Sequence, residues 1–348
     1  MTVAAIFSFA WATLIAAPPL ADAQDSKPAP RVVDLPEAGK LPEAGTRLDA
    51  TDTLDCQADP LADAELCLAG LRWVPGPFAV DVRPAVDGRG DSLLCFPSPH
   101  PAGDAAHDRV SMEWYAARDD SGQPIRAPAV VVVHESGRSM PVGRMIARGL
   151  QSHGLHAMMI HLPGYGQRRS PLSDKPEMIL ASLRQGIADV RRARDAVAAL
   201  PLVDTSRIGV QGTSLGGFVT STVVGLDAGF DRGFILLAGG RLDQVVLQGK
   251  KDAAKIRQQL ASLGIDDAQI VELARPIEPL RLAHRIRPQQ TWLYNGMFDD
   301  VVPRASSYAL AQAAKLPEGH HIELMADHYT GIIFLPVVLQ QIKDAMTE

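Results

Sequence analysis

The chain has 348 residues, of which 46% are apolar and 21% charged, and its formal net charge is −6. This length suits one large α/β domain with an extension, and the composition is that of an ordinary globular protein. The sequence contains no block of basic residues, so we expect no nucleic-acid partner. The spacing of its three cysteines is not that of a metal site, and we expect no bound metal.

The first 23 residues have the pattern of a secretory signal peptide. Residues 3–17 form an apolar run, and Ala21-Asp22-Ala23 fits a small-x-small cleavage site. The run is short for a membrane span, and no second one follows, so the mature protein is expected to have no membrane segment. We therefore predict export to the periplasm or the extracellular space. The first five residues lack the Lys or Arg of a typical signal, which leaves a weak signal or a different true start as open alternatives. An uncleaved anchor or a buried helix is the alternative to a signal peptide.

Residues 24–109 predict two further segments ahead of the main domain. Residues 24–54 are rich in Pro, Ala and acidic residues, which is typical of a flexible linker. Residues 55–109 predict a strand-rich, antiparallel extension. In an exported protein a disulfide between Cys56 and Cys67 would be tolerated, with Cys95 buried and free, but the sequence does not establish this pairing.

From residue 110 to residue 348 the pattern becomes that of an α/β domain. Val110–Ala116 alternates between apolar and polar residues, and Ala129–Val133 is the β-branched run of a strand buried on both faces. Glu177–Leu200 has the apolar face of a helix. Further strands are predicted at Leu155–Ile160, Arg207–Gly212, Phe234–Ala238, Thr291–Asn295 and Ile322–Met325. This alternation predicts a mostly parallel central sheet flanked by helices.

Residues 239–287 interrupt the alternation of strands and helices. Their composition is largely helical, and they lie between two predicted core strands. An insertion at this position would overhang the C-terminal edge of the sheet, so we interpret it as a small helical cap over a site. A surface excursion with no role in substrate choice is the alternative.

The stretch Gly212-Thr213-Ser214-Leu215-Gly216 follows a predicted strand and begins a helix. Gly-x-Ser-x-Gly at such a turn is the pattern of a nucleophile elbow, which exposes a serine side chain at the tip of the turn. The two glycines lack the Cβ atoms that would collide as strand and helix close up. Ser214 is therefore the candidate nucleophile, and a glycine-rich turn with an incidental serine is the alternative.

A serine hydroxyl needs a base, and the base needs an orienting acid. Asp299 follows the strand at 291–295 and is the candidate acid, with Asp300 as the second choice. His328 lies on the loop after the last predicted strand, where it completes the order serine, acid, histidine. The adjacent histidines at 320 and 321 precede that strand, so we expect them at its opposite end, on the surface.

An acyl intermediate carries an oxyanion that needs two N–H donors. The amide of Leu215, at the start of the helix, is one candidate. The loop after the strand at 129–133 should supply the other, and we favour Ser136 with Glu135 as the alternative. His134 is expected to brace this loop rather than to act as a second base.

Together these motifs resemble the α/β-hydrolase fold superfamily over residues 110–348. The lead-in Val203-Asp204-Thr205-Ser206-Arg207-Ile208-Gly209 is most similar to the branch that contains prolyl oligopeptidases and dienelactone hydrolases. One departure is Glu135, which stands where the oxyanion loop of the family often has glycine. The resemblance rests on His134–Gly137, His161–Gly166, Val203–Gly217, Gly296–Pro303 and His328.

The resemblance implies a serine hydrolase that forms an acyl-enzyme and needs no cofactor. Our preferred interpretation is an exported esterase acting on a small-molecule or polymer-linked ester. A peptidase or amidase with the same triad, an acyltransferase and a non-catalytic binding protein are the alternatives.

Overall fold

The computed structural model describes residues 39–174 and 178–348. The predicted signal peptide and the first part of the predicted linker lie outside these residues. None of the helices in the described part has the length and apolarity needed to cross a bilayer.

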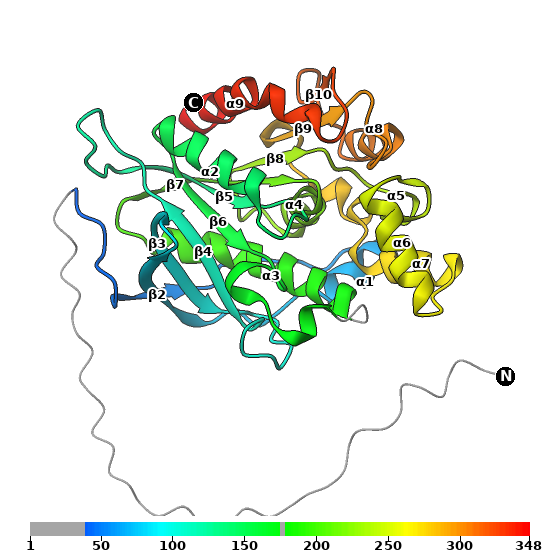
Figure 1. Ribbon diagram of the computed structural model, residues 1–348, viewed down its shortest axis with the longest axis horizontal. Coiled ribbons are helices and arrows are strands. Elements are labelled where there is room, and N and C mark those ends of the chain that lie inside the picture. Colours follow the sequence, from blue (N-terminus) through cyan, green and yellow to red (C-terminus); the bar gives the residue numbers. More distant parts are fainter. Residues whose placement is uncertain (1–38, 175–177) are drawn as a thin grey trace, which may run out of the picture. The chain divides into compact units, whose positions relative to one another are not determined.

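The described residues contain one ten-stranded sheet in the order β1-β2-β3-β4-β6-β5-β7-β8-β9-β10 (Figure 1). Its first strands pair antiparallel, as expected of the extension, and β4 also pairs antiparallel with β6. These strands are β1 (Arg47–Thr51), β2 (Pro77–Val86), β3 (Arg89–Pro97), β4 (Arg109–Tyr115) and β6 (His156–His161). Across the sheet from β6 to β10, each strand pairs parallel with its neighbour. These further strands are β5 (Ala127–Val133), β7 (Val203–Thr213), β8 (Arg232–Leu236), β9 (Thr291–Gly296) and β10 (His321–Leu324).

The predicted linker and extension need two corrections. Residues 47–51, placed in the linker, form β1, which pairs with β2 along its whole length and buries Ala50. The extension also holds helix α1 (Ala62–Ala69), which the prediction of a strand-rich extension did not include. Both errors have the same cause, because these elements are stabilised by partners distant in sequence that local composition does not reveal.

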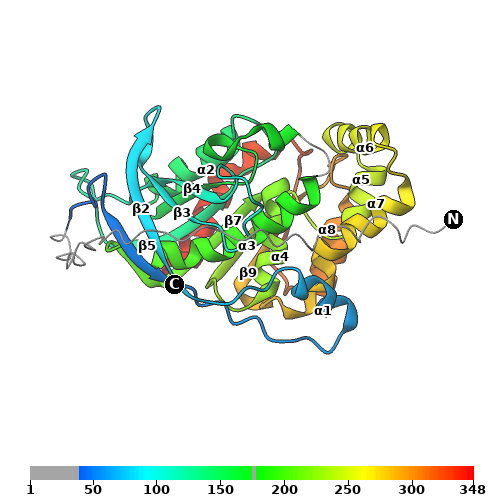
Figure 2. The ribbon, with the colours of Figure 1, turned by 90° about the horizontal axis from the view of Figure 1, so that it is seen from below.

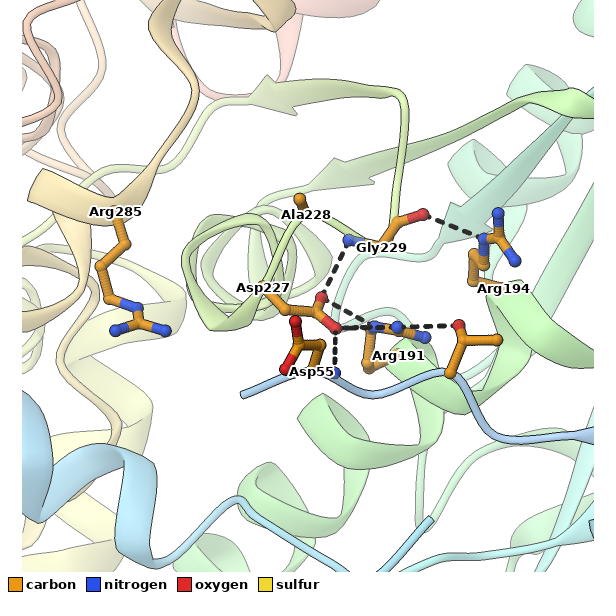
Figure 3. A pocket seen from close by; sticks show the side chains of 8 residues that line it. Asp55, Arg191, Arg194, Asp227, Ala228, Gly229 and Arg285 are labelled. Atoms are coloured by element: carbon orange, nitrogen blue, oxygen red, sulfur yellow. Dashed lines mark hydrogen bonds and ion pairs between the residues drawn. The ribbon is translucent and has the colours of Figure 1, made fainter. Parts of the chain in front are cut away.

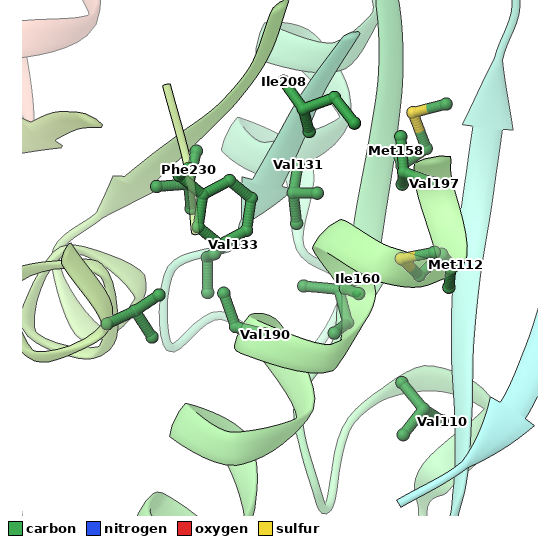
Figure 4. Packing of buried hydrophobic residues seen from close by; sticks show 14 of the residues in the cluster. Val110, Met112, Val131, Val133, Met158, Ile160, Val190, Val197, Ile208 and Phe230 are labelled. Carbon is green, nitrogen blue, oxygen red and sulfur yellow. The ribbon is translucent and has the colours of Figure 1, made fainter. Parts of the chain in front are cut away.

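The sheet is buried on both faces, because its central strands are apolar on both sides. Val131 and Val133 of β5 pack on one face among residues of α3 (Ile179–Ala198) and α4 (Leu215–Leu226), as Figure 4 shows in part. Val130 and Val132 of the same strand pack on the other face, against α2 (Pro141–Ser152) and α9 (Leu335–Thr347). Helix α8 (Arg304–Ala313) packs with β8 and β9 through a smaller cluster.

The predicted cap is helical. It contains α5 (Leu242–Gln248), α6 (Asp252–Ser262) and α7 (Asp267–Ala274), which Figure 2 shows gathered beside α8. The chain then returns to β9 through a series of 3₁₀ turns between Arg275 and Gln290. A second apolar cluster joins the cap to the loop after β9, since Val245 and Ala253 pack on Val301 and Val302.

The three cysteines are free thiols, so the tolerated disulfide does not form. Cys67 faces the 3₁₀ turns at the end of the cap region, and its Sγ donates to the carbonyl oxygen of Arg275 at 3.3 Å. Burial raises the pKa of the Cys67 thiol to about 11, which disfavours the thiolate that would react. Cys95 is also buried, beside the hydroxyl of Ser111.

Candidate active site

Ser214 lies at the tip of the turn between β7 and α4, where the sequence pattern placed it. Its φ of 53° and ψ of −113° are strained for a residue with a side chain. The flanking glycines make this turn sterically possible. A Cβ at Gly212 would lie 2.1 Å from the carbonyl oxygen of Gly216, and a Cβ at Gly216 would lie 2.1 Å from that of Val133. The tight packing of α4 on β5 and β7 therefore fixes Ser214 at the carboxyl end of the sheet.

The structure brings the three predicted triad side chains into one hydrogen-bonded chain. Ser214 Oγ lies 2.9 Å from His328 Nε2, and His328 Nδ1 lies 2.7 Å from Asp299 Oδ2. The side chains of His328 and Asp299 are only 7% and 3% exposed, while Ser214 is partly accessible. A hydroxyl in contact with an imidazole that is itself held by a buried carboxylate can lose its proton to that imidazole.

The turn after β9 decides between the two adjacent aspartates. Asp299 Oδ1 accepts the amides of Val301 and Val302, both at 2.9 Å, which leaves Oδ2 for His328. Asp300 faces the cap instead, where its Oδ1 lies 3.1 Å from Lys251 Nζ. The structure therefore joins the first choice of acid, and not the second, to the histidine.

The loop after β5 lies beside the elbow, as expected. His134 is fully buried, and its ring contacts the Glu135 carbonyl and the Leu162 amide. Burial lowers the pKa of His134 to about 3, so it is neutral and braces the loop. The amide of Ser136 donates no hydrogen bond to any group of the described chain. Leu215 is the first residue of α4, and its N–H has no acceptor within the helix.

The side chain of Glu135 has a role that the sequence did not reveal. Its carboxylate accepts the amides of Val142 at 3.1 Å and Gly143 at 3.0 Å, at the start of α2. These are helix N–H groups without an intrahelical acceptor, and a negative charge at a helix N-terminus is favourable. Glu135 thus joins the loop after β5 to the helix that follows it.

A buried polar cluster beneath this loop was also missed by sequence reasoning. Glu113 of β4 accepts from Arg144 of α2 and from His161 at the end of β6, while Arg144 also donates to the Ser139 carbonyl. Burial by itself would raise the pKa of Glu113, but the hydrogen bonds from His161 and Arg144 lower it to about 2. The only signal in the sequence was a glutamate within a predicted strand, which does not identify its partners.

The remaining predicted histidines are structural. His320 stacks on Trp292 and contacts the Thr291 carbonyl at 3.0 Å. His321 contacts Asn295 Oδ1 at 2.7 Å. Both are partly buried rather than fully on the surface, because they pack on the neighbouring strand β9.

The cap contacts the loops that carry Asp299 and His328. Lys251 Nζ lies 4.9 Å from the centre of the Tyr329 ring as well as next to Asp300. The Tyr329 hydroxyl donates to Asp252 at 3.1 Å, and its ring lies against His328. Residues at the start of α6 therefore contact Asp300 and Tyr329, which are the neighbours in sequence of Asp299 and His328.

A hollow of about 550 Å³ lies apart from these residues, and none of the triad lines it (Figure 3). Its arginines are already paired, since Arg191 contacts Asp227 and Asp195, and Arg285 contacts Asp59 and backbone carbonyls. Within the described ranges, no group of three or more His, Cys, Asp or Glu side chains is arranged to hold a metal ion.

Comparison with known proteins supports the assignment of the fold. A model of the prolyl oligopeptidase family matches residues 179–331. No curated protein matches the sequence. Acetyl xylan esterase 1 from Thermoanaerobacterium sp. JW/SL YS485 is 16% identical with a TM-score of 0.60, over 85% of this chain and 96% of that one.

Two further solved structures have the same fold. The acetyl xylan esterase from Paenibacillus sp. R4 is 16% identical with a TM-score of 0.57, over 84% of this chain and 96% of that one. The acylaminoacyl peptidase from Pyrococcus horikoshii is 12% identical with a TM-score of 0.52, over 77% of this chain and 47% of that one. The chain thus has the fold of these hydrolases, and residues 179–331 are similar to the prolyl oligopeptidase family.

Proposed function

We propose that the protein is an exported carboxylic ester hydrolase that acts through an acyl-enzyme on Ser214. The observation that carries this proposal is the continuous chain of contacts from Ser214 Oγ through His328 to Asp299, at 2.9 and 2.7 Å. Export is supported by the apolar run and small-x-small site within residues 1–23.

The reaction proceeds in two acyl-transfer steps. Ser214 Oγ attacks the ester carbonyl while His328 Nε2 takes its proton, and Asp299 holds the imidazole in the required tautomer and stabilises its charged form. The amides of Leu215 and Ser136 donate to the oxyanion. His328 then protonates the leaving alcohol, activates a water molecule for the second attack, and Ser214 is released with the free acid.

The substrate class is proposed from the fold neighbours and the position of the cap. The similar solved structures include two acetyl xylan esterases, so acetyl esters of small molecules and of carbohydrate polymers are the first substrates to test. The cap lies next to the triad through Lys251 and Tyr329, which places it where it can contact the leaving group or the acyl chain.

A peptidase or amidase is the second candidate, because the matched family model is that of prolyl oligopeptidases. The strands between residues 47 and 115 continue the central sheet instead of forming a separate domain above the site, which favours small ester substrates. Hydrolysis of peptide p-nitroanilides faster than of the matching esters would favour the peptidase.

The deciding experiment compares the mature protein with Ser214→Ala on p-nitrophenyl esters from acetate to long chains. We expect hydrolysis by the wild type and its loss in the variant. If the wild type cleaves no ester, a fluorophosphonate probe distinguishes the alternatives. Labelling at Ser214 would indicate a peptidase or an acyltransferase, whereas no labelling would contradict catalysis and favour a binding protein.

A further inference from the structure

The loop at residues 134–136 leaves β5 directly beside the nucleophile turn. Val133 pairs with Gly212 across the sheet, and a Cβ at Gly216 would lie 2.7 Å from the His134 carbonyl oxygen. The backbone that follows His134 is therefore held next to Ser214. Whether this backbone can donate a hydrogen bond to the oxyanion depends on the orientation of each peptide group in the loop.

The hydrogen bonds of the His134 ring fix its tautomer. Its Nδ1 lies 2.6 Å from the carbonyl oxygen of Glu135, which can only accept, so Nδ1 carries the proton. Its Nε2 accepts the amide of Leu162 at 3.1 Å, so Nε2 is unprotonated. The ring is fully buried and neutral, and it cannot exchange these two roles without losing both contacts.

The contact at Nδ1 orients a peptide unit. The carbonyl of Glu135 and the N–H of Ser136 belong to the same peptide bond, and the described part of the chain contains no cis peptide. In a trans peptide these two groups point in opposite directions. Because the His134 ring draws the Glu135 carbonyl inward, the Ser136 N–H is turned away from that ring, and it has no acceptor in the described structure.

Two further contacts hold the peptide units on either side. The Glu135 carboxylate accepts two amides of α2, which ties the side chain of this residue to the helix. The Tyr165 hydroxyl donates to the Ser136 carbonyl at 3.3 Å, and the Tyr165 ring lies 4.6 Å from that of His134. The carbonyls of Glu135 and Ser136 are thus both held by side chains, which leaves the N–H between them as the free donor.

We propose that His134 is a positioning residue that sets the orientation of the Glu135–Ser136 peptide, so that the Ser136 N–H faces the oxyanion formed at Ser214. This inference rests on the proposed esterase activity. It adds the residue that orients the second oxyanion donor of that activity. It also explains how a loop with glutamate in place of glycine is kept in one conformation: the glutamate side chain is held by the helix that follows.

Two substitutions separate the functions of the two ring nitrogens. His134→Asn places an amide nitrogen where Nδ1 was and can still donate to the Glu135 carbonyl. His134→Gln can reach the Leu162 amide as an acceptor but has no donor at the Nδ1 position. His156→Gln is the matched control, because His156 is an equally buried histidine that contacts the backbone carbonyls of Leu202 and Ile125.

The measurement is the ratio of kcat/KM for p-nitrophenyl acetate to that for its thiono analogue. Sulfur accepts hydrogen bonds weakly, so loss of an oxyanion donor affects the oxygen ester far more than the thiono ester. We expect His134→Gln to lower kcat on the oxygen ester by about 100-fold, with KM little changed, and to lower the ratio by about tenfold or more. His134→Asn should recover most of this loss, and His156→Gln should lower Tm without changing the ratio.

The outcomes distinguish this inference from the proposed function. If the wild type is active, Ser214→Ala is inactive and His134→Gln leaves the ratio of oxygen-ester to thiono-ester kcat/KM unchanged, the proposed esterase activity is supported. The positioning role of His134 is then overturned. The positioning role would also be overturned if His134→Asn and His134→Gln lost the same amount of activity in proportion to their decrease in Tm. Such a result would indicate that His134 contributes only to packing. A wild type that cleaves neither ester would overturn both.

Discussion

At the scale of single residues, the two aspartates after β9 have different surroundings. Asp299 is almost fully buried and shares its two oxygens between His328 and the amides of its own turn. Asp300 is 34% exposed and faces Lys251. Adjacent residues with the same side chain therefore provide an internal test of the triad.

We expect Asp299→Asn to lower kcat by about 10³-fold or more, because the amide cannot hold His328 in the tautomer that accepts the serine proton. Asp300→Asn is the matched control and should lower kcat by less than about tenfold, since it disturbs one partly exposed ion pair. Steady-state rates on p-nitrophenyl acetate measure both. Comparable losses in the two variants would contradict the assignment of the acid.

Glu113 gives a prediction about stability and pH. Its pKa is lowered from 4.5 to about 2 by its partners, so the ionised form stabilises the folded state. That stabilisation is fully present above the pKa of the unfolded chain and is lost as the pH falls through 4.5 towards 2. We expect the wild type to exceed Glu113→Gln in free energy of unfolding by about 3 kcal/mol at neutral pH.

The measurement is urea unfolding of both proteins between pH 7 and pH 2. The difference between them should narrow steadily below pH 5. Glu323→Gln is the control, because the ion pair of Glu323 with Arg304 is at the surface and should contribute little. A difference that does not depend on pH would mean that the Glu113 carboxylate is not ionised in the folded protein.

At the scale of elements, the start of α6 links the cap to the triad. Lys251 contacts Asp300 and the Tyr329 ring, whereas Lys255 of the same helix pairs with Asp252. The cap is also attached by a small apolar cluster, by the Lys250 amide, which donates to the Asp300 carbonyl, and by Asp252, which accepts from the Tyr329 hydroxyl. Lys251 is the side chain of the cap that contacts residues of both loops of the triad.

We expect Lys251→Ala to raise KM for long-chain p-nitrophenyl esters by about three- to tenfold, because a partly exposed charge contact of this kind contributes about 1 kcal/mol. Hydrolysis of the acetate should change less, since a short acyl chain has less contact with the cap. Lys255→Ala is the matched control and should leave both substrates unaffected. Equal changes for acetate and long-chain esters would contradict a role of this contact in substrate size.

At the scale of the whole chain, residues 52–72 contact both α3 and the segment before β9, and charged side chains make these contacts. Asp52 forms a buried pair with Arg192 of α3, and Thr53 donates to Asp195. Asp59 pairs with Arg285, and Asp63 with Arg275 and Arg281, all in the 3₁₀ turns at the end of the cap region. The extension thus connects the base of the cap to the main helices.

We expect Asp52→Asn to lower the free energy of unfolding by about 3 kcal/mol, because it leaves the Arg192 guanidinium buried without a full counter-charge. Asp63→Asn removes an exposed partner and should change Tm little. Thermal unfolding followed by circular dichroism measures both. Equal effects of the two substitutions would show that burial does not govern how firmly the extension is attached.

The sequence by itself determined the fold class and the candidate nucleophile, base and first choice of acid. A side chain at Gly212 would collide with Gly216 of the same five-residue turn, and a steric limit over so few residues is visible in the sequence. Asp299 and His328 could be selected because the carboxyl ends of parallel strands meet at one edge of the sheet, so a residue just after a strand has a predictable place.

Tertiary structure alone decided the rest. Which of Asp299 and Asp300 contacts the histidine depends on the turn after β9, in which the amides of Val301 and Val302 donate to Asp299. The partners of Glu113 and the pairing of strand β1 depend on contacts between segments far apart in the chain. The local sequence determines where a strand or a turn can form. The orientation of a buried side chain or peptide group is determined by the hydrogen-bonding partners that the folded chain places next to it.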